Sequence, residues 1–156
     1  MNAPMKAIAA AVLMCATIAC AADEYVAEVT TSGTFDDVKQ QLVLAIENHG
    51  LVVNHESKVG EMLERTGKDL GAVKQIYVRA ELIEFCSAAL SRQVMEADAR
   101  LLAFCPFGVG IYVLPGEEGK VHLVYRRPRV DAGNPAAQSL QRVDQLLHDI
   151  VQEAGQ

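Results

Sequence analysis

The 156-residue chain has no tryptophan, no excess of basic residues and none of the short motifs that mark common catalytic sites. Its 14 Lys and Arg stand against 20 Asp and Glu, which gives a net charge of −6. Nucleic acids and anionic membranes reward basic patches, so this balance argues against either as the main partner. A phosphate-binding loop, a dinucleotide fingerprint and a nucleophile elbow are all missing, and no catalytic constellation replaces them. We therefore favour a protein that is not an enzyme.

Metal and haem motifs are also missing. None of the four histidines lies at a ligand spacing such as His-x-x-x-His, and there is no Cys-x-x-Cys. A metal site would have to be assembled from distant residues, for example His55, His122 and Cys86. Surface or capping roles are the favoured interpretation of the histidines, and His49 suits a helix C-terminus. We expect neither a metal nor a cofactor.

The one long apolar run lies at the N-terminus and indicates export. Lys6 is followed by apolar residues 7–19 and a small-x-small cleavage site, which is typical of a signal peptide over residues 1–21. The run is shorter than the roughly 20 residues that cross a bilayer, and no later stretch reaches that length. We predict a periplasmic protein that begins near Ala22 and has no integral membrane segment. A lipid anchor on Cys20 is less favoured, because leucine is not found three residues before it.

Cleavage leaves 135 residues, which suits one domain with a single core. The leader removes one lysine and no acid, so 13 basic residues stand against 20 acidic ones, a net charge of −7. We expect a first strand and lead-in over residues 22–33 and an α+β domain over residues 34–128. Residues 129–156 are expected to form a linker and a C-terminal amphipathic helix that packs on the same domain.

Residue periodicity predicts the order β-α-β-(α)-β-α-β-β-α. Strands are expected at 24–30, 51–57, 75–85, 104–114 and 120–126, and helices at 34–50, 59–70, 87–100 and 136–153. The first helix has the clearest pattern, with Thr34 and Asp37 as a capping pair. One face of this helix is apolar and comprises Phe35, Val38, Leu42, Ala45 and Ile46. The order predicts an α+β fold, a single two-layer domain with a mostly antiparallel sheet and helices on one face.

Two segments give mixed signals. In the third strand the apolar side is occupied by even-numbered residues up to Leu82 and then by Ile83 and Phe85, which predicts a bulge or turn. The second helix contains glycines that weaken it, and we expect Met62 and Leu63 to face inward.

The last two strands predict a hairpin with one face free for binding. Pairing outward from the loop at 115–119 places Tyr112 opposite His122. The core side then comprises Cys105, Phe107, Val109, Ile111, Val113, Val121, Leu123 and Tyr125. The opposite side carries the candidate binding face: Gly108, Gly110, Tyr112, His122 and Arg126. Such a face fits an unknown small molecule or protein partner, including a second copy of the chain.

Two cysteines remain after cleavage, Cys86 and Cys105, and both are candidate reactive thiols. An even pair in an oxidising compartment is typical of a disulfide. However, a helix over residues 87–100 would be about 20 Å long and would hold the cysteines at opposite ends of the sheet, beyond the Cα separation of about 7 Å that a disulfide requires. We therefore predict two free thiols. A helix N-terminus can lower the pKa of Cys86, although a small apolar core residue is the alternative interpretation.

Several short motifs lie between Phe35 and Pro128. They are a helix ending in His49-Gly50-Leu51, a strand ending in Glu84-Phe85-Cys86, a helix containing Met95-Glu96-Ala97-Asp98, and Pro106 followed by a hairpin. Together they resemble the bacterial and archaeal domain-of-unknown-function family numbered 302, which usually has Cys-Asn-Pro where this chain has Cys86-Ser87-Ala88. The resemblance implies a compact α+β domain, sometimes dimeric, with no established activity.

Two functional hypotheses remain. The first is an exported binding or accessory module that acts through the hairpin face or a dimer interface. The alternative is a thiol-based redox or oxidant-sensing protein centred on Cys86, with Cys105 as a distant or intermolecular partner.

Overall fold

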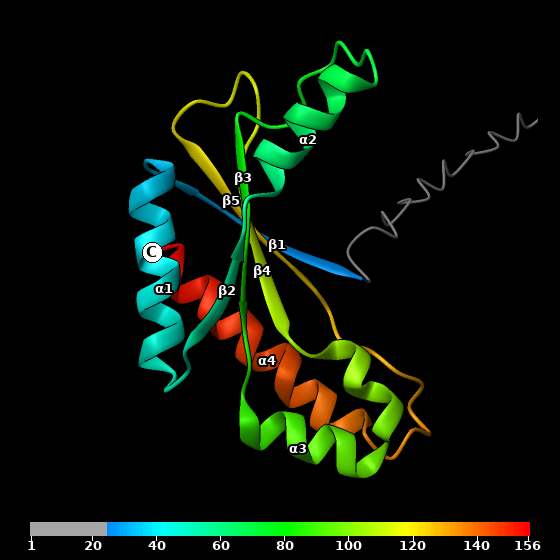
Figure 1. Ribbon diagram of the computed structural model, residues 1–156. Coiled ribbons are helices and arrows are strands. Elements are labelled where there is room, and N and C mark those ends of the chain that lie inside the picture. Colours follow the sequence, from blue (N-terminus) through cyan, green and yellow to red (C-terminus); the bar gives the residue numbers. More distant parts are fainter. Residues whose placement is uncertain (1–24) are drawn as a thin grey trace, which may run out of the picture.

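The computed structural model describes residues 25–156, so the expected signal peptide lies outside the described residues. The elements in chain order are β1 (Val26–Ser32), α1 (Phe35–Asn48), β2 (Val53–Ser57), α2 (Val59–Asp69), β3 (Arg79–Phe85), α3 (Ala88–Ala97), the 3-10 helix η2 (Ala99–Phe104), β4 (Phe107–Val113), β5 (Lys120–Arg126) and α4 (Ala137–Ala154), as Figure 1 shows. None of the helices within residues 25–156 is both long and apolar enough to span a bilayer.

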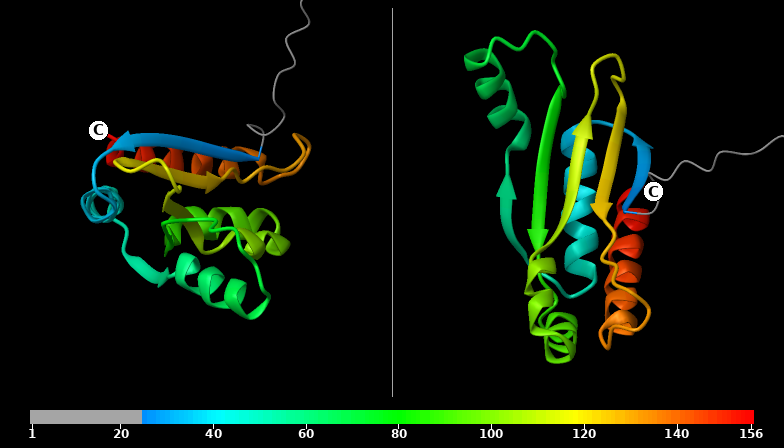
Figure 2. Two further views of the ribbon diagram at one scale, coloured as in Figure 1. Left: turned by 90° about the horizontal axis from the view of Figure 1, so that it is seen from above. Right: turned by 90° about the vertical axis from the view of Figure 1, so that its right-hand side faces the viewer.

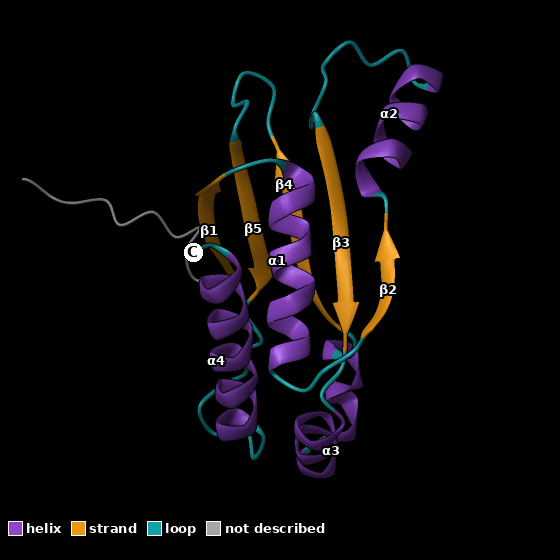
Figure 3. Cartoon of the chain, turned by 90° about the vertical axis from the view of Figure 1, so that its left-hand side faces the viewer, coloured by secondary structure: helices purple, strands orange, loops and turns teal. Residues whose placement is uncertain are grey.

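The five strands form one antiparallel sheet in the order β1-β5-β4-β3-β2. Helices α1 and α4 lie across one face of the sheet (Figure 3), and in the right-hand view of Figure 2 they stand behind the strands. No described helix crosses the opposite face, which we call the uncovered face. Helix α2 extends beside the β2 edge, and α3 lies beyond the ends of β3 and β4. The predicted α+β fold and element order are therefore confirmed.

The two long helices bury the apolar faces that their sequences predict. Thr34 caps α1, because its Oγ1 accepts a hydrogen bond of 3.2 Å from the Asp37 N–H. The buried residues of α1 are Phe35, Val38, Leu42, Ala45 and Ile46. Those of α4 include Leu140, Val143, Leu147 and Ile150. These two faces meet the sheet and each other to form the core.

The hairpin between β4 and β5 has the predicted register. Tyr112 lies opposite His122, and Ile111 lies opposite Leu123. The odd-numbered residues of both strands are buried against the helices, since successive side chains in a strand point to opposite faces. The one exception to the predicted core side is Cys105, which precedes β4 and is only half-buried.

The expected bulge or turn after Leu82 is not in β3 itself: the irregularity lies in the neighbouring β2, between Val53 and His55, opposite Phe85 and Glu84. The pairing of β3 with β4 runs without a shift from Arg79 to Phe85. The side chains that point toward the helices are Glu81, Ile83 and Phe85, whereas Leu82 lies on the uncovered face. The apolar pattern changes sides because a buried carboxylate occupies a core-facing position and a leucine occupies the uncovered one. The strand also begins at Arg79 rather than at residue 75.

The expectation that α2 would bury Met62 and Leu63 was also wrong. No residue of α2 is buried, and the Met62 side chain is 45% exposed. The helix comes close to β3 at Gly60, where a Cβ atom would lie 2.8 Å from the Ala80 backbone nitrogen. Glycine is therefore required at position 60 for α2 to approach β3 so closely.

The helix expected over residues 87–100 is broken at Asp98. Helix α3 ends at Ala97, Asp98 has an extended backbone (φ −154°, ψ 106°), and η2 follows as a separate 3-10 helix. The Asp98 Oδ1 accepts a 3.1 Å hydrogen bond from the Arg100 N–H, as expected of an aspartate at a helix N-terminus. Because the chain turns at this point, η2 packs back against α3 and returns the chain to the sheet.

Candidate functional site

The five residues predicted to form a binding face all belong to the uncovered face. Gly108, Gly110 and Tyr112 alternate along β4 with its buried residues, and His122 and Arg126 lie on the same side of β5, where His122 is only 9% exposed. The strand period of two therefore brings them to the side that faces away from α1 and α4. Tyr112 and His122 are direct cross-strand partners.

A hollow of about 380 Å³ lies on this face and includes three of the five residues. Its volume lies within the range of roughly 300–1,000 Å³ that small-molecule sites occupy. Its lining residues are Val26, Leu82, Glu84, Phe104, Pro106, Phe107, Gly108, Gly110, Val124, Tyr125, Arg126, Pro128 and Leu147, of which Phe107, Tyr125 and Leu147 belong to the buried core. Most of them are apolar, and two are charged. The predicted residues Gly108, Gly110 and Arg126 therefore share one concave site.

The floor of this hollow depends on the absence of side chains in β4. A Cβ atom on Gly108 would lie 3.1 Å from Leu82 Cδ1, and one on Gly110 would lie 3.0 Å from Val124 Cγ1. Leu82 and Val124 thus lean over the glycines from the two neighbouring strands. A larger residue at either glycine would fill the space that the hollow occupies.

Charges of opposite sign stand on the two sides of Gly108. Glu84 of β3 is its register partner, and the β4–β5 register, extended by one residue from Val109 and Tyr125, brings Arg126 to its other side. Two strand spacings separate β3 from β5, about 9–10 Å. The Arg126 guanidinium lies 5.7 Å from the centre of the Phe104 ring, so this aromatic side chain supports it at the edge of the hollow.

Tyr112 and His122 form a stacked pair beside the hollow. Their ring centres are 4.7 Å apart and their planes differ by 5°. The Tyr112 hydroxyl donates a 2.8 Å hydrogen bond to Glu28 of β1. Burial and the nearby Glu28 carboxylate raise the pKa of Tyr112, so its hydroxyl stays protonated and remains a donor.

Both ring nitrogens of His122 are engaged by carboxylates on opposite sides. Nδ1 lies 2.6 Å from Glu28 Oε1, and Nε2 lies 2.7 Å from Glu117 Oε2. The carboxylates hold the ring in place and leave neither nitrogen free for a metal or for proton transfer. Among residues 25–156, no group of three or more His, Cys, Asp or Glu could hold a metal ion, and His55, His122 and Cys86 do not come together as one.

The expected separation of the two cysteines was wrong. Cys86 follows β3 and Cys105 stands two residues before β4, and the adjoining residues Phe85 and Phe107 are register partners. The two Sγ atoms are 2.9 Å apart. The estimate of about 20 Å assumed one straight helix between the two cysteines. The helix is broken at Asp98, and η2 leads the chain back to the end of the sheet where β3 ends.

The environment of Cys86 does not favour a reactive thiolate. Burial, together with the hydrogen bond and charge of Cys105, raises the pKa of the Cys86 thiol to about 11. A backbone hydrogen bond from Phe107 opposes this shift, and the Glu84 carboxylate adds to it. The helix N-terminus therefore does not produce the lowered pKa that a redox sensor needs.

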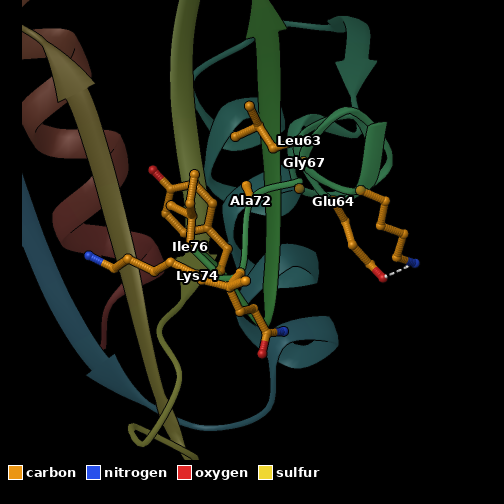
Figure 4. Close-up of a pocket in the computed structure, with 11 residues that line it drawn as sticks. Leu63, Glu64, Gly67, Ala72, Lys74 and Ile76 are labelled. Atoms are coloured by element: carbon orange, nitrogen blue, oxygen red, sulfur yellow. Dashed lines mark hydrogen bonds and ion pairs between the residues drawn. The ribbon is translucent and has the colours of Figure 1, made fainter. Parts of the chain in front are cut away.

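A second hollow, which the sequence did not point to, lies between α2 and the segment 72–77 (Figure 4). It measures about 330 Å³, and Leu63, Gly67, Ala72 and Ile76 are among its lining residues. Glu64 also lines it and pairs with Lys68 at 2.8 Å. Only the exposed apolar residues after α2, such as the fully exposed Val73, could have indicated this surface.

Sequence reasoning also missed several partners of the candidate binding face. Glu28 lies within the first predicted strand, but its contact with Tyr112 and His122 depends on the pairing of β1 with β5. Glu117 was assigned to the hairpin loop without a role. These contacts join residues that are far apart in the sequence or depend on loop shape, so no local pattern indicates them.

Comparisons with known proteins agree with this fold. The crystal structure of an uncharacterized conserved protein DUF302 from Bacillus stearothermophilus superimposes with a TM-score of 0.69 at 16% identity, covering 84% of this chain and 98% of that one. At this identity the likeness concerns the fold alone. No curated protein matches the chain. The family model for the domain of unknown function DUF302 matches residues 27–154, and the chain therefore belongs to the DUF302 family.

Proposed function

We propose that this protein is an exported binding module that holds a small molecule on the uncovered face of its sheet. The observation that carries the proposal is the hollow around Gly108 and Gly110, whose floor is apolar and whose sides carry Glu84 and Arg126. Small-molecule sites combine apolar lining with a few placed polar groups in this way. The contacts of His122 with two carboxylates give the neighbouring face a fixed shape rather than a catalytic group.

The charges indicate the class of ligand. A mainly apolar body would cover Leu82 and Val124, an acidic group would pair with Arg126, and an amine would pair with Glu84. Within residues 25–156, Arg126 forms no ion pair, so its guanidinium is available to a ligand. The expected ligand is therefore a small amphipathic molecule in which an apolar chain joins an acidic group to an amine.

Three matched six-carbon probes test this ligand class by thermal shift. We expect millimolar 6-aminohexanoate to raise the melting temperature by about 2–5 °C, and hexanoate and hexylamine to raise it less. In Arg126→Gln, 6-aminohexanoate should raise the melting temperature no more than hexylamine does, because its acidic group has lost its partner. In Glu84→Gln, it should raise the melting temperature no more than hexanoate does, because its amine has lost its partner. Gly108→Val should abolish the response to all three probes, because its side chain fills the hollow beside Leu82.

The matched control is Arg129→Gln, because Arg129 is an arginine three positions after Arg126 that does not line this hollow. It should leave all three shifts unchanged. Equal shifts for the native protein and Gly108→Val, or no shift with any probe, would contradict the proposal. If Arg129→Gln also loses the shift in melting temperature, the shift reflects the positive charge of the protein in general and not binding in the hollow.

Export is part of the proposal and rests on the apolar run and cleavage site at residues 1–21. When the full chain is expressed in a Gram-negative host, we expect the periplasmic fraction to contain a protein that begins at Ala22. Intact mass and N-terminal sequencing measure this directly. An uncleaved cytoplasmic chain, or a chain that begins at a lipidated Cys20, would contradict it.

The alternative function, thiol redox chemistry centred on Cys86, receives less support. A sensing or exchanging thiol needs a low pKa, whereas burial and the neighbouring Cys105 raise the pKa of Cys86 to about 11.

A further inference from the structure

The only two cysteines of the described chain meet at one end of the sheet. Cys86 and Cys105 are 19 positions apart in the sequence, and their Sγ atoms are 2.9 Å apart. The loop between them contains α3 and η2, which leave β3 and return to β4. The pairing of Phe85 with Phe107 fixes the two chain segments beside each other, so the contact follows from the sheet register.

We infer that Cys86 and Cys105 form an intramolecular disulfide in the exported protein, which closes α3 and η2 into a covalent loop. A disulfide bond measures about 2.05 Å, so the sulfur atoms need to approach by only about 0.9 Å. Both residues are half-buried, which leaves them within reach of a small oxidant. The Ser91 Oγ of α3 lies 3.8 Å from Cys105 Sγ and adds a polar contact.

The oxidant is a disulfide of a small molecule or of a thiol–disulfide oxidoreductase. One cysteine thiolate attacks that disulfide, forms a mixed disulfide and releases one thiol; the second cysteine then displaces the other thiol as the Sγ–Sγ bond forms. In total the protein loses two protons and two electrons, and the oxidant gains both. Such bonds persist in oxidising compartments, so the inference also rests on the export of this chain.

The bond should stabilise the folded state by restricting the unfolded chain. It would close a loop of 20 residues, counting both cysteines. For a domain of this size, reduction of such a loop is expected to lower the melting temperature by roughly 5–15 °C. Part of this loop, η2, carries Phe104 at the edge of the hollow, so the bond would also hold one side of the proposed ligand site.

Peptide mapping of the native protein provides the first test. Trypsin cleaves at Arg79, Arg92, Arg100 and Lys120, which places the two cysteines on separate peptides, 80–92 and 101–120. After incubation of the purified chain with oxidised glutathione we expect these peptides to be joined, with a mass gain of about 2 Da on reduction. Two cysteines that alkylate without reduction, two glutathione adducts, or a link only between two chains would overturn the inference.

Melting temperatures provide the second test. Cys86→Ser and Cys105→Ser should each melt at the temperature of the reduced native protein, and a reductant should not move either variant. Ser91→Ala keeps both cysteines and should retain the joined peptides and the full effect of reduction. If a cysteine variant fails to fold, the peptide map of the native chain still decides the question, independently of whether any ligand binds.

Discussion

Replacement of Glu81 by alanine is expected to lower the free energy of unfolding by about 2–3 kcal/mol. Glu81 lies on the helix side of β3 and is only 5% exposed. Removing one partner of a buried charge cluster costs roughly 3–5 kcal/mol when the remaining charges have no other partner. The expected loss is smaller in this protein because both cationic partners of Glu81 keep a second carboxylate. Urea unfolding at pH 7 measures the change.

The contacts of Glu81 explain this expectation. The Lys39 Nζ of α1 donates to Glu81 Oε2 at 2.6 Å, and the Arg79 Nη2 donates to Oε1 at 2.8 Å. Lys39 also pairs with Glu56 of β2 at 2.7 Å, and Arg79 pairs with Asp36 of α1 at 2.7 Å. The cluster therefore ties α1 to β2 and β3, and Glu81 is the carboxylate that both cations share.

The cluster should also make stability depend on acid. Burial raises the pKa of Glu81, but hydrogen bonds and charge from Lys39 and Arg79 outweigh it and lower the pKa overall. A carboxylate with a lowered folded-state pKa stabilises the protein above its unfolded pKa, about 4.3, and this stability is lost as the pH falls through the folded value. Glu81→Gln should therefore lose less stability than the native protein between pH 6 and pH 3.

Glu56→Ala is the matched control, since it removes the exposed carboxylate of the same cluster. Its side chain is 43% exposed, and exposed pairs contribute about 0–1 kcal/mol. A result in which Glu56→Ala and Glu81→Ala destabilise the protein equally would show that burial does not set the strength of the cluster.

Glu81 shows why the sequence predicted the fold better than it predicted the contacts between side chains. The apolar stripes of α1 and α4 and the hairpin register follow from local periodicity, and these predictions were confirmed. Glu81 was assigned to the polar side of its strand because its charge outweighed its position. Its spacing of two from Ile83 and Phe85 indicates the core side, but only its contact with Lys39 makes a carboxylate stable there.

The cysteine pair shows a second limit of local patterns. Helical spacing continues through Asp98, so residues 87–100 were predicted as one helix, and the distance between the cysteines was derived from its length. Aspartate is a favoured residue at helix starts, and this was the available signal that a new turn begins there. By contrast, alternation along the strands brought the candidate binding residues to one face, because a period of two does not depend on where the loops lead.

Replacement of Phe85 by alanine is expected to lower the free energy of unfolding by about 3–5 kcal/mol. Phe85 is fully buried at the end of β3, and its ring meets that of Phe107 edge-on, with centres 6.4 Å apart and planes at 75°. The truncation leaves a cavity in the core at the end of β3. Urea unfolding measures the loss, and Leu102→Ala, at a side chain that is 62% exposed, should change stability by less than about 0.5 kcal/mol.

A double-mutant cycle with Phe107→Ala separates the ring contact from burial. Edge-to-face aromatic pairs contribute about 0.5–1.5 kcal/mol beyond the area that they bury, so the double variant should lose that much less than the sum of the single variants. The cycle should give the same coupling in the reduced and the oxidised protein, because the sheet register holds the two rings together. A coupling that disappears on reduction would mean instead that the bond between Cys86 and Cys105 positions the end of β3 against β4, and that the register there does not form without it.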